Sequence, residues 1–82
     1  MDETEKGLVD ILLRDFSVRR EVFSHSLICY DIGICDGEFQ EFMALAEERF
    51  DLKLPSPCPL PFKEEEASIE IVADWIKLQQ RE

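Results

Sequence analysis

The feature that most constrains the fold is a phenylalanine-rich stretch with helical spacing between residues 36 and 50. Its apolar side chains recur at the intervals that place them on one face of an α-helix, while acidic side chains take the other faces. Asp36 stands directly before the stretch, where a short acidic residue typically caps a helix. The sequence therefore predicts an amphipathic helix over residues 36–50, with a buried face made of Phe39, Phe42, Met43, Ala46 and Phe50.

Two further stretches have the same helical period, at residues 3–16 and 68–80. Thr4 is the expected N-cap of the first, with Glu5 in the first turn, where the helix dipole favours negative charge. Ser68 is the expected cap of the second. We predict an all-α fold without a sheet, whose other core side chains are Leu8, Ile11, Leu12, Phe16, Ile69, Val72, Trp75 and Ile76.

The segments between these helices lack a helical period. Residues 17–31 are predicted to form a long loop pinned onto the core by scattered apolar side chains. Gly33 is expected to adopt a positive φ and to close the turn before the next helix. Four prolines at alternate positions in residues 55–61 predict a stiff, extended connector, and residues 62–66 predict a single short turn.

Length and charge limit the classes of function. The 82 residues predict one domain, residues 1–82, and 45% hydrophobic content is too high for a disordered tail. No apolar run approaches the ~20 residues of a membrane helix, and the acidic start MDETEKGL does not fit a signal peptide. A net charge of −10 disfavours nucleic acid and anionic membranes as partners. We therefore expect a cytoplasmic monomer that binds a basic protein partner.

The three cysteines, Cys29, Cys35 and Cys58, are an odd number in a chain without an export signal. Free thiols are the first interpretation, and disulfides are the lesser alternative. Their spacing fits no zinc pattern and His25 does not complete one, so no metal is expected. Cys35 next to a helix N-terminus has the position of a reactive thiol, but His25 lies ten residues upstream, which favours a structural cysteine.

Several segments together resemble acyl carrier proteins. YDIG at residues 30–33 is similar to the Asp-Leu-Gly step of that family, EFMALAEERF at 41–50 to its second helix, and the stretch 68–76 to its closing helix. The resemblance covers most of the chain apart from the proline segment, where the family has a short third helix. It implies a four-helix bundle with three main helices and one short one. It also implies a second helix whose acidic face docks on basic patches of partner enzymes.

The chain departs from this family at the residue that carries the prosthetic group. Acyl carrier proteins attach phosphopantetheine to the serine of an Asp-Ser-Leu motif, and here that place has Cys35, Asp36 and Gly37. Ser24 and Ser26 lie upstream in the loop and do not replace the missing serine. The resemblance is therefore to a divergent bacterial branch that carries no cofactor, and we expect Asp36 to be a helix cap and not a catalytic group.

The function expected from these features is a non-enzymatic interaction module. One alternative is a divergent acyl carrier protein of lipid or polyketide-type metabolism, modified at an unusual residue. Another is a small thiol-based redox protein that uses Cys35 and His25. The alternative interpretation of the acidic helix face is an ordinary solvated surface, as most such faces are. The residues predicted to bind a partner are Asp36, Glu38, Glu41, Glu47 and Glu48.

Overall fold

A computed structural model describes residues 2–19, 21–52 and 62–80. These residues form no strand and one isolated antiparallel bridge, so the prediction of an all-α fold is confirmed. The three predicted helices are present, and each bound lies within one residue of its expected place. The proline segment at 55–61 lies outside the described residues. In chain order the elements are α1 (Glu3–Asp15), the π-helix η1 (Ile28–Ile32), α2 (Gly37–Arg49), the 3₁₀-helix η2 (Glu64–Glu66) and α3 (Ile69–Gln80).

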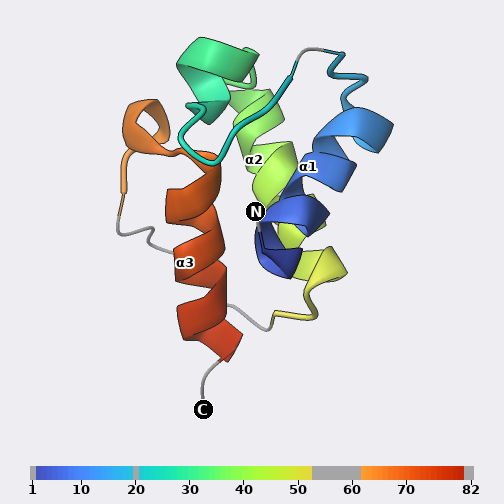
Figure 1. The fold of residues 1–82 in the computed structure, drawn as a ribbon, viewed down its shortest axis with the longest axis vertical. Coiled ribbons are helices and arrows are strands. Elements are labelled where there is room, and N and C mark those ends of the chain that lie inside the picture. The colour runs from blue at the N-terminus through green and yellow to red at the C-terminus, as the bar shows by residue number, and fades with distance from the viewer. Residues whose placement is uncertain (1, 20, 53–61, 81–82) are drawn as a thin grey trace.

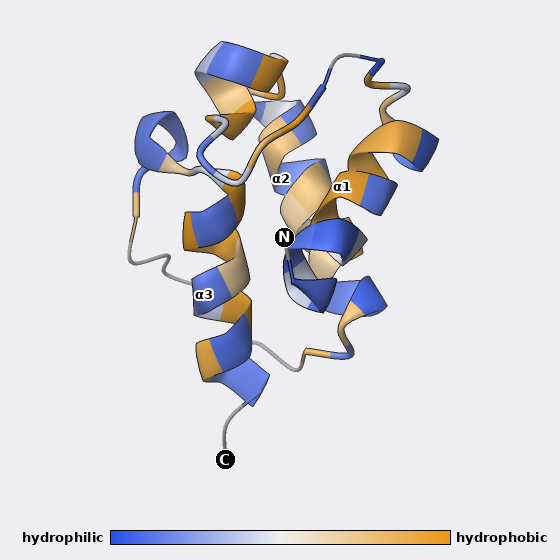
Figure 2. Ribbon diagram, viewed as in Figure 1, coloured by the Kyte–Doolittle hydropathy of each residue, from blue (hydrophilic) through white to orange (hydrophobic). Residues whose placement is uncertain are grey.

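Helix α1 packs against both other long helices, α2 and α3 (Figure 1). Hydrophobic and hydrophilic residues alternate along each helix (Figure 2), and the hydrophobic ones meet in one core. None of the helices in the described part of the chain is both long enough and apolar enough to cross a membrane. The buried hydrophobic residues are Leu8, Ile11, Leu12, Ile28, Ile34, Phe39, Phe42, Met43, Ala46, Ala67, Ile69, Val72, Ala73, Trp75 and Ile76.

Two predicted core residues, Phe16 and Phe50, are only half-buried. Each is the C-cap of its helix, where the helix stops. The ring of Phe16 meets Phe42 edge-on, with centroids 6.3 Å apart. The ring of Phe50 lies over Gly7, where an added Cβ would come within 2.7 Å of its Cζ atom. Both rings therefore pack against the core, but at its rim.

The helix caps agree with the sequence at α3 and differ at α1. The hydroxyl of Ser68 accepts a hydrogen bond from the Ile71 backbone at 3.3 Å, as predicted for a cap. At α1 the cap is Asp2 and not Thr4. Its carboxylate accepts from the Glu5 backbone at 2.9 Å, and the Glu5 side chain accepts from the Asp2 backbone. This capping box satisfies two backbone donors at once, which Thr4, already inside the helix, could not do.

The predicted loop over residues 17–31 ends in the π-helix η1. Five residues are too few for a hydrophobic period, which explains why the sequence did not reveal this turn. Gly33 follows it with φ of 95°, so the prediction of a positive φ is confirmed. Ile28 is fully buried, whereas Phe23 and Tyr30 are exposed. The loop is therefore pinned by some of its apolar side chains and not by others.

A short pairing of backbones joins this loop to the start of α3. The Ile28 N–H donates to the Ala67 carbonyl at 2.9 Å, and the Ile69 N–H donates to the Ser26 carbonyl at 3.2 Å. The pairing sets η1 next to η2, at the N-terminal end of α2 (Figure 1). Three segments that are far apart in the sequence thus meet at one end of the helical core.

Candidate functional site

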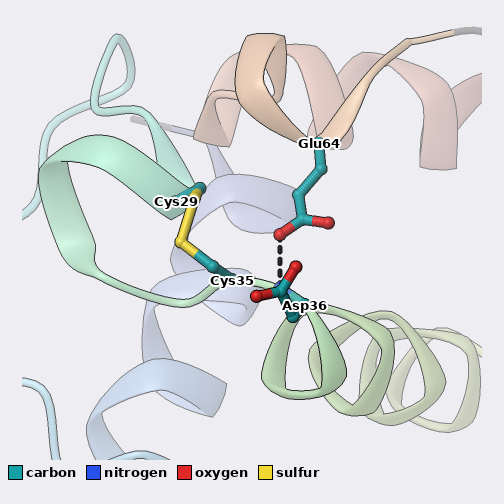
Figure 3. The surroundings of a disulfide bond; sticks show 4 residues. All are labelled: Cys29, Cys35, Asp36 and Glu64. Carbon is teal, nitrogen blue, oxygen red and sulfur yellow. Dashed lines mark hydrogen bonds between the residues drawn. A yellow bond between two sulfur atoms is a disulfide. The ribbon is translucent and has the colours of Figure 1, made fainter.

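A disulfide between Cys29 and Cys35 joins η1 to the start of α2 (Figure 3). The prediction of free thiols is therefore wrong for these two residues, and Cys58 lies outside the described part. The left-handed turn at Gly33 reverses the chain, which brings the two Cα atoms to 4.7 Å. The number of cysteines alone does not reveal this pairing, because the pairing depends on the turn between them.

Backbone hydrogen bonds hold the same turn. The Gly33 N–H donates to the Cys29 carbonyl, and the Ile34 N–H donates to the Ile28 carbonyl, both at 2.9 Å. Ile28 and Ile34 are buried in the core on either side of the turn. The position of both cysteines is therefore set by the core and the backbone as well as by their own bond.

Asp36 precedes α2 but does not cap it in the expected way. Its backbone has φ of 53° and ψ of −122°, whereas a capping residue is normally extended. In this conformation its carboxylate accepts no capping hydrogen bond from the described backbone. Its own N–H instead donates to the carboxylate of Glu64 on η2 (Figure 3). The expected cap is thus replaced by a contact between distant parts of the chain.

Glu64 completes a cluster that we call the cysteine corner: Cys29, Cys35, Asp36 and Glu64. The two sulfur atoms and a carboxylate oxygen of Glu64 all lie within 4.8 Å of one another, and all three side chains are half-buried. Sulfur and carboxylate are zinc ligands, so these three residues are the group in the described chain that could hold a metal. The corner borders a shallow hollow of about 330 Å³, which Tyr30 and Glu65 also line.

The five predicted partner-binding residues do not form one continuous surface. Glu38 and Glu41 are exposed on the first turns of α2, following the exposed Asp36. Glu47 is half-buried, because at ~100° per residue it lies about 120° around the helix from Glu41. Glu48 shares the face of Glu41 but lies further along the helix.

Glu48 lies in a region of mixed charge. It lines a hollow between α1 and α2 together with Asp10, Asp15, Arg14 and Arg49. Both arginines pair with Asp10, at 3.2 Å and 2.9 Å respectively. This part of α2 is therefore a mixed-charge contact between helices, and it differs from the acidic start of the helix.

Acidic side chains continue from the start of α2 onto η2. We call Asp36, Glu38, Glu41, Glu64 and Glu65 the acidic end. No lysine or arginine occurs in the sequence between Arg20 and Arg49, and Lys63 is the basic residue that borders η2. Sequence periodicity indicated the α2 members. It missed Glu64 and Glu65, because only the packing of η2 against η1 brings them here.

His25, Cys35 and Trp75, the other candidate residues, each have a partner within the fold. The ring of His25 stacks on Phe23, with centroids 5.5 Å apart, and the Cys35 sulfur is bonded to Cys29. The described structure therefore contains no thiol–imidazole pair of the kind that activates a cysteine. Trp75 is buried and meets Phe62 edge-on at 6.2 Å, so its assignment to the core is confirmed.

Shifted pKa values occur in the contact between α1 and α3. A hydrogen bond from the Lys77 ammonium lowers the pKa of Asp2, with a further contribution from the Glu5 backbone. The same bond to Asp2 raises the pKa of Lys77. This pair links the start of α1 to the last turn of α3 and has no part in the cysteine corner.

Comparison with known proteins gives no further guide. The chain matches no protein-family model, and no curated protein and no solved structure is significantly similar to it.

Proposed function

We propose that this protein is a non-enzymatic interaction module that docks a basic surface of a protein partner through its acidic end. One observation carries the proposal. Exposed carboxylates on the first turns of α2 continue onto η2, and the bond from the Asp36 N–H to Glu64 holds the two elements together. The carboxylates thus come from two elements fixed relative to each other, as a docking surface requires.

Electrostatics favours this use. A patch of one sign on a chain of net charge −10 attracts cations over a long range and accelerates encounter with a basic partner. Each exposed ion pair contributes only ~0–1 kcal/mol, so docking must use several carboxylates together. Four residues of the acidic end are exposed, whereas Glu48 shares a mixed-charge hollow with Arg14 and Arg49.

The order of the elements supports a relation to acyl carrier proteins. A first amphipathic helix, a long loop that ends in η1, an acidic helix and a closing helix follow one another here, which is the order that the resemblance implies. We propose a divergent, non-carrying form of that bundle, cytoplasmic and bacterial, in which Asp36 stands where the family has its modified serine.

Charge reversal tests the docking proposal. A partner first identified by crosslinking to the full chain is purified, and its association rate is measured against wild type and against Glu38→Lys/Glu41→Lys/Glu65→Lys. We expect association to slow on the order of tenfold or more, and added salt to slow the wild type similarly.

The matched control reverses three exposed acidic residues elsewhere, Glu3→Lys/Asp15→Lys/Glu21→Lys, and so changes the net charge equally. It should slow association much less. Equal effects of the two triple variants would show that only net charge matters, and the proposed surface would be abandoned.

Intact mass tests whether any carrier activity remains. The wild type and Asp36→Ser are each co-expressed with a phosphopantetheinyl transferase. We expect no added mass in either, because Gly37 provides no leucine-like side chain beside the new serine. Added mass on the wild type would replace this proposal with a carrier modified at an unusual residue. Modification of Asp36→Ser alone would show that only the serine was lost.

The disulfide favours one second candidate, a thiol-based redox protein. Such a protein would accelerate the reduction of insulin disulfides by a dithiol. We expect the wild type and Cys29→Ser/Cys35→Ser to give the same rate, because no histidine stands beside either sulfur in the described structure. A clear acceleration by the wild type alone would favour the redox function.

A further inference from the structure

The cysteine corner brings two sulfur atoms and one carboxylate within the reach of a single ion. We propose that reduction of the Cys29–Cys35 disulfide converts this corner into a Zn²⁺ site, with both thiolates and the Glu64 carboxylate as ligands. This site goes beyond the docking function and does not depend on it.

The distances suit zinc after a small rearrangement. Zinc binds sulfur at ~2.3 Å and carboxylate oxygen at ~2.0–2.2 Å in a tetrahedron, so its ligand atoms are roughly 3.3–3.8 Å apart. The three ligand atoms here already lie within 4.8 Å of one another. Once the sulfur–sulfur bond opens, side-chain rotation about fixed Cα atoms is sufficient to surround an ion.

The backbone that holds the ligands does not require the disulfide. The turn is closed by hydrogen bonds to the carbonyls of Cys29 and Ile28, and Ile28 and Ile34 anchor it in the core. Glu64 is oriented by the N–H of Asp36, which is the kind of outer contact that usually fixes a metal-binding carboxylate. Backbone hydrogen bonds, buried isoleucines and the contact from Asp36 to Glu64 thus position the ligands without the disulfide.

The donor set selects the ion. Thiolates favour zinc and other soft or borderline ions over Mg²⁺ and Ca²⁺, which prefer oxygen ligands alone. Three protein ligands leave a fourth position for water, as in open zinc sites. The half-buried sulfurs and the adjoining hollow give both a reductant and the ion access to the corner.

A dithiol can reduce the Cys29–Cys35 disulfide. The dithiol transfers two electrons and two protons, becomes a disulfide itself, and leaves two thiols on Cys29 and Cys35. Zinc then displaces the two thiol protons as it binds. A small-molecule disulfide re-forms the Cys29–Cys35 bond by exchange, takes up the two electrons and two protons from solvent to become two thiols, and leaves the ion free, so binding is reversible.

Cobalt substitution tests the site on the full chain, with Cys58→Ser in every sample so that only two thiols remain. The disulfide is reduced with a phosphine, which consumes water and becomes its oxide, because dithiols themselves bind zinc. We expect one Co²⁺ per reduced chain with a thiolate charge-transfer band, displaced by Zn²⁺, and no band from the oxidised chain. A reduced chain that binds no stoichiometric ion would overturn the proposal.

Two matched variants identify the ligands. Glu64→Gln should weaken Co²⁺ binding by tenfold or more, whereas Glu65→Gln, which changes a carboxylate outside the ligand group, should leave it unchanged. Cys29→Ser should abolish the band. Equal affinity of Glu64→Gln and wild type, or a band that persists in Cys29→Ser, would contradict the assigned site.

Circular dichroism covers the case in which reduction unfolds the chain. Zinc should then restore the helical signal, because metal affinity adds to folding when the ligands are brought together only in the folded state. A reduced chain that stays unfolded with zinc present would equally contradict the proposal.

Discussion

The helical core and the cysteine corner are held together in different ways. In the core, α1 meets α2 and α3 through fully buried side chains such as Leu8, Phe42 and Ile76. In the corner, η1, the start of α2 and η2 are joined by a disulfide, by backbone hydrogen bonds and by the contact from Asp36 to Glu64. Apolar burial stabilises the first region, and specific bonds define the second.

The two regions therefore have different roles: the core stabilises the fold, and the corner positions the groups that could react or bind a ligand. Burial of apolar area is non-directional, so the core fixes where the helices lie without placing any reactive group. Bonds at the corner are directional, so they set the positions of sulfur and carboxylate atoms relative to one another. Damage to the core should therefore unfold the protein, whereas changes at the corner should alter its local order and its ligands.

The largest expected loss of stability comes from a substitution in the core. Phe42 is fully buried, and Phe42→Ala should cost about 3–5 kcal/mol of unfolding free energy, through lost burial and the cavity left behind. That is comparable with the whole stability of many small domains. Urea denaturation measures it, with the exposed Phe23→Ala as the control that should change stability little. Equal losses for the two variants would mean that the buried face is assigned wrongly.

Removal of the disulfide should have the next largest effect and should act locally. Cys29→Ser/Cys35→Ser should cost about 2 kcal/mol, the entropy of the short loop that the bond closes. Hydrogen exchange should accelerate most at the amides of Gly33 and Ile34, which donate within this turn. Equal acceleration in the middle of α1 would show that corner and core unfold as one unit.

Substitutions of Asp36 should reveal backbone strain at the cysteine corner. Its positive φ is unfavourable for a residue with a side chain, and glycine adopts it freely. Asp36→Gly should therefore stabilise the protein by about 1 kcal/mol, after the extra entropy of glycine in the unfolded chain is subtracted. Asp36→Ala, which neither relieves strain nor removes a capping bond, should change the unfolding midpoint little. A loss of ~1 kcal/mol in Asp36→Ala would instead restore the capping role.

The smallest effect on stability should come from the exposed ion pair of Asp2 and Lys77. The lowered pKa of Asp2 gives stability that is present above its unfolded pKa of ~3.9 and is lost as the pH falls through its folded value. The raised pKa of Lys77 gives stability that is present below ~10.4 and is lost as the pH rises through its folded value.

Thermal unfolding of Lys77→Gln across pH checks this pair. The variant should melt slightly below the wild type between about pH 5 and 9. The difference should shrink as Asp2 becomes protonated below about pH 4. A difference that stays constant down to pH 2 would show that Lys77 stabilises α3 by packing and not by its charge.

Particular residues show how far sequence patterns reach. The spacing of Phe39, Phe42 and Met43 located the buried face of α2 correctly, because helical periodicity is a local property. Gly33 has the positive φ that its place before the helix predicts, for an equally local reason. Thr4 was the wrong cap, since Asp2 and Glu5 satisfy each other in a capping box. Cys29 and Cys35 were expected to be free, because no local pattern predicts how the turn between them closes.

Local sequence patterns predict the three long helices, their buried faces and the all-α class, since each depends on side chains a few positions apart. The packing of distant segments places Glu64 beside Cys29 and Cys35, and it places Glu48 in a hollow that Arg14 and Arg49 also line. The physical reason is that these contacts join segments far apart in the chain. Their geometry depends on how the core packs and where the turn at Gly33 points, and neither is encoded in any short stretch of residues.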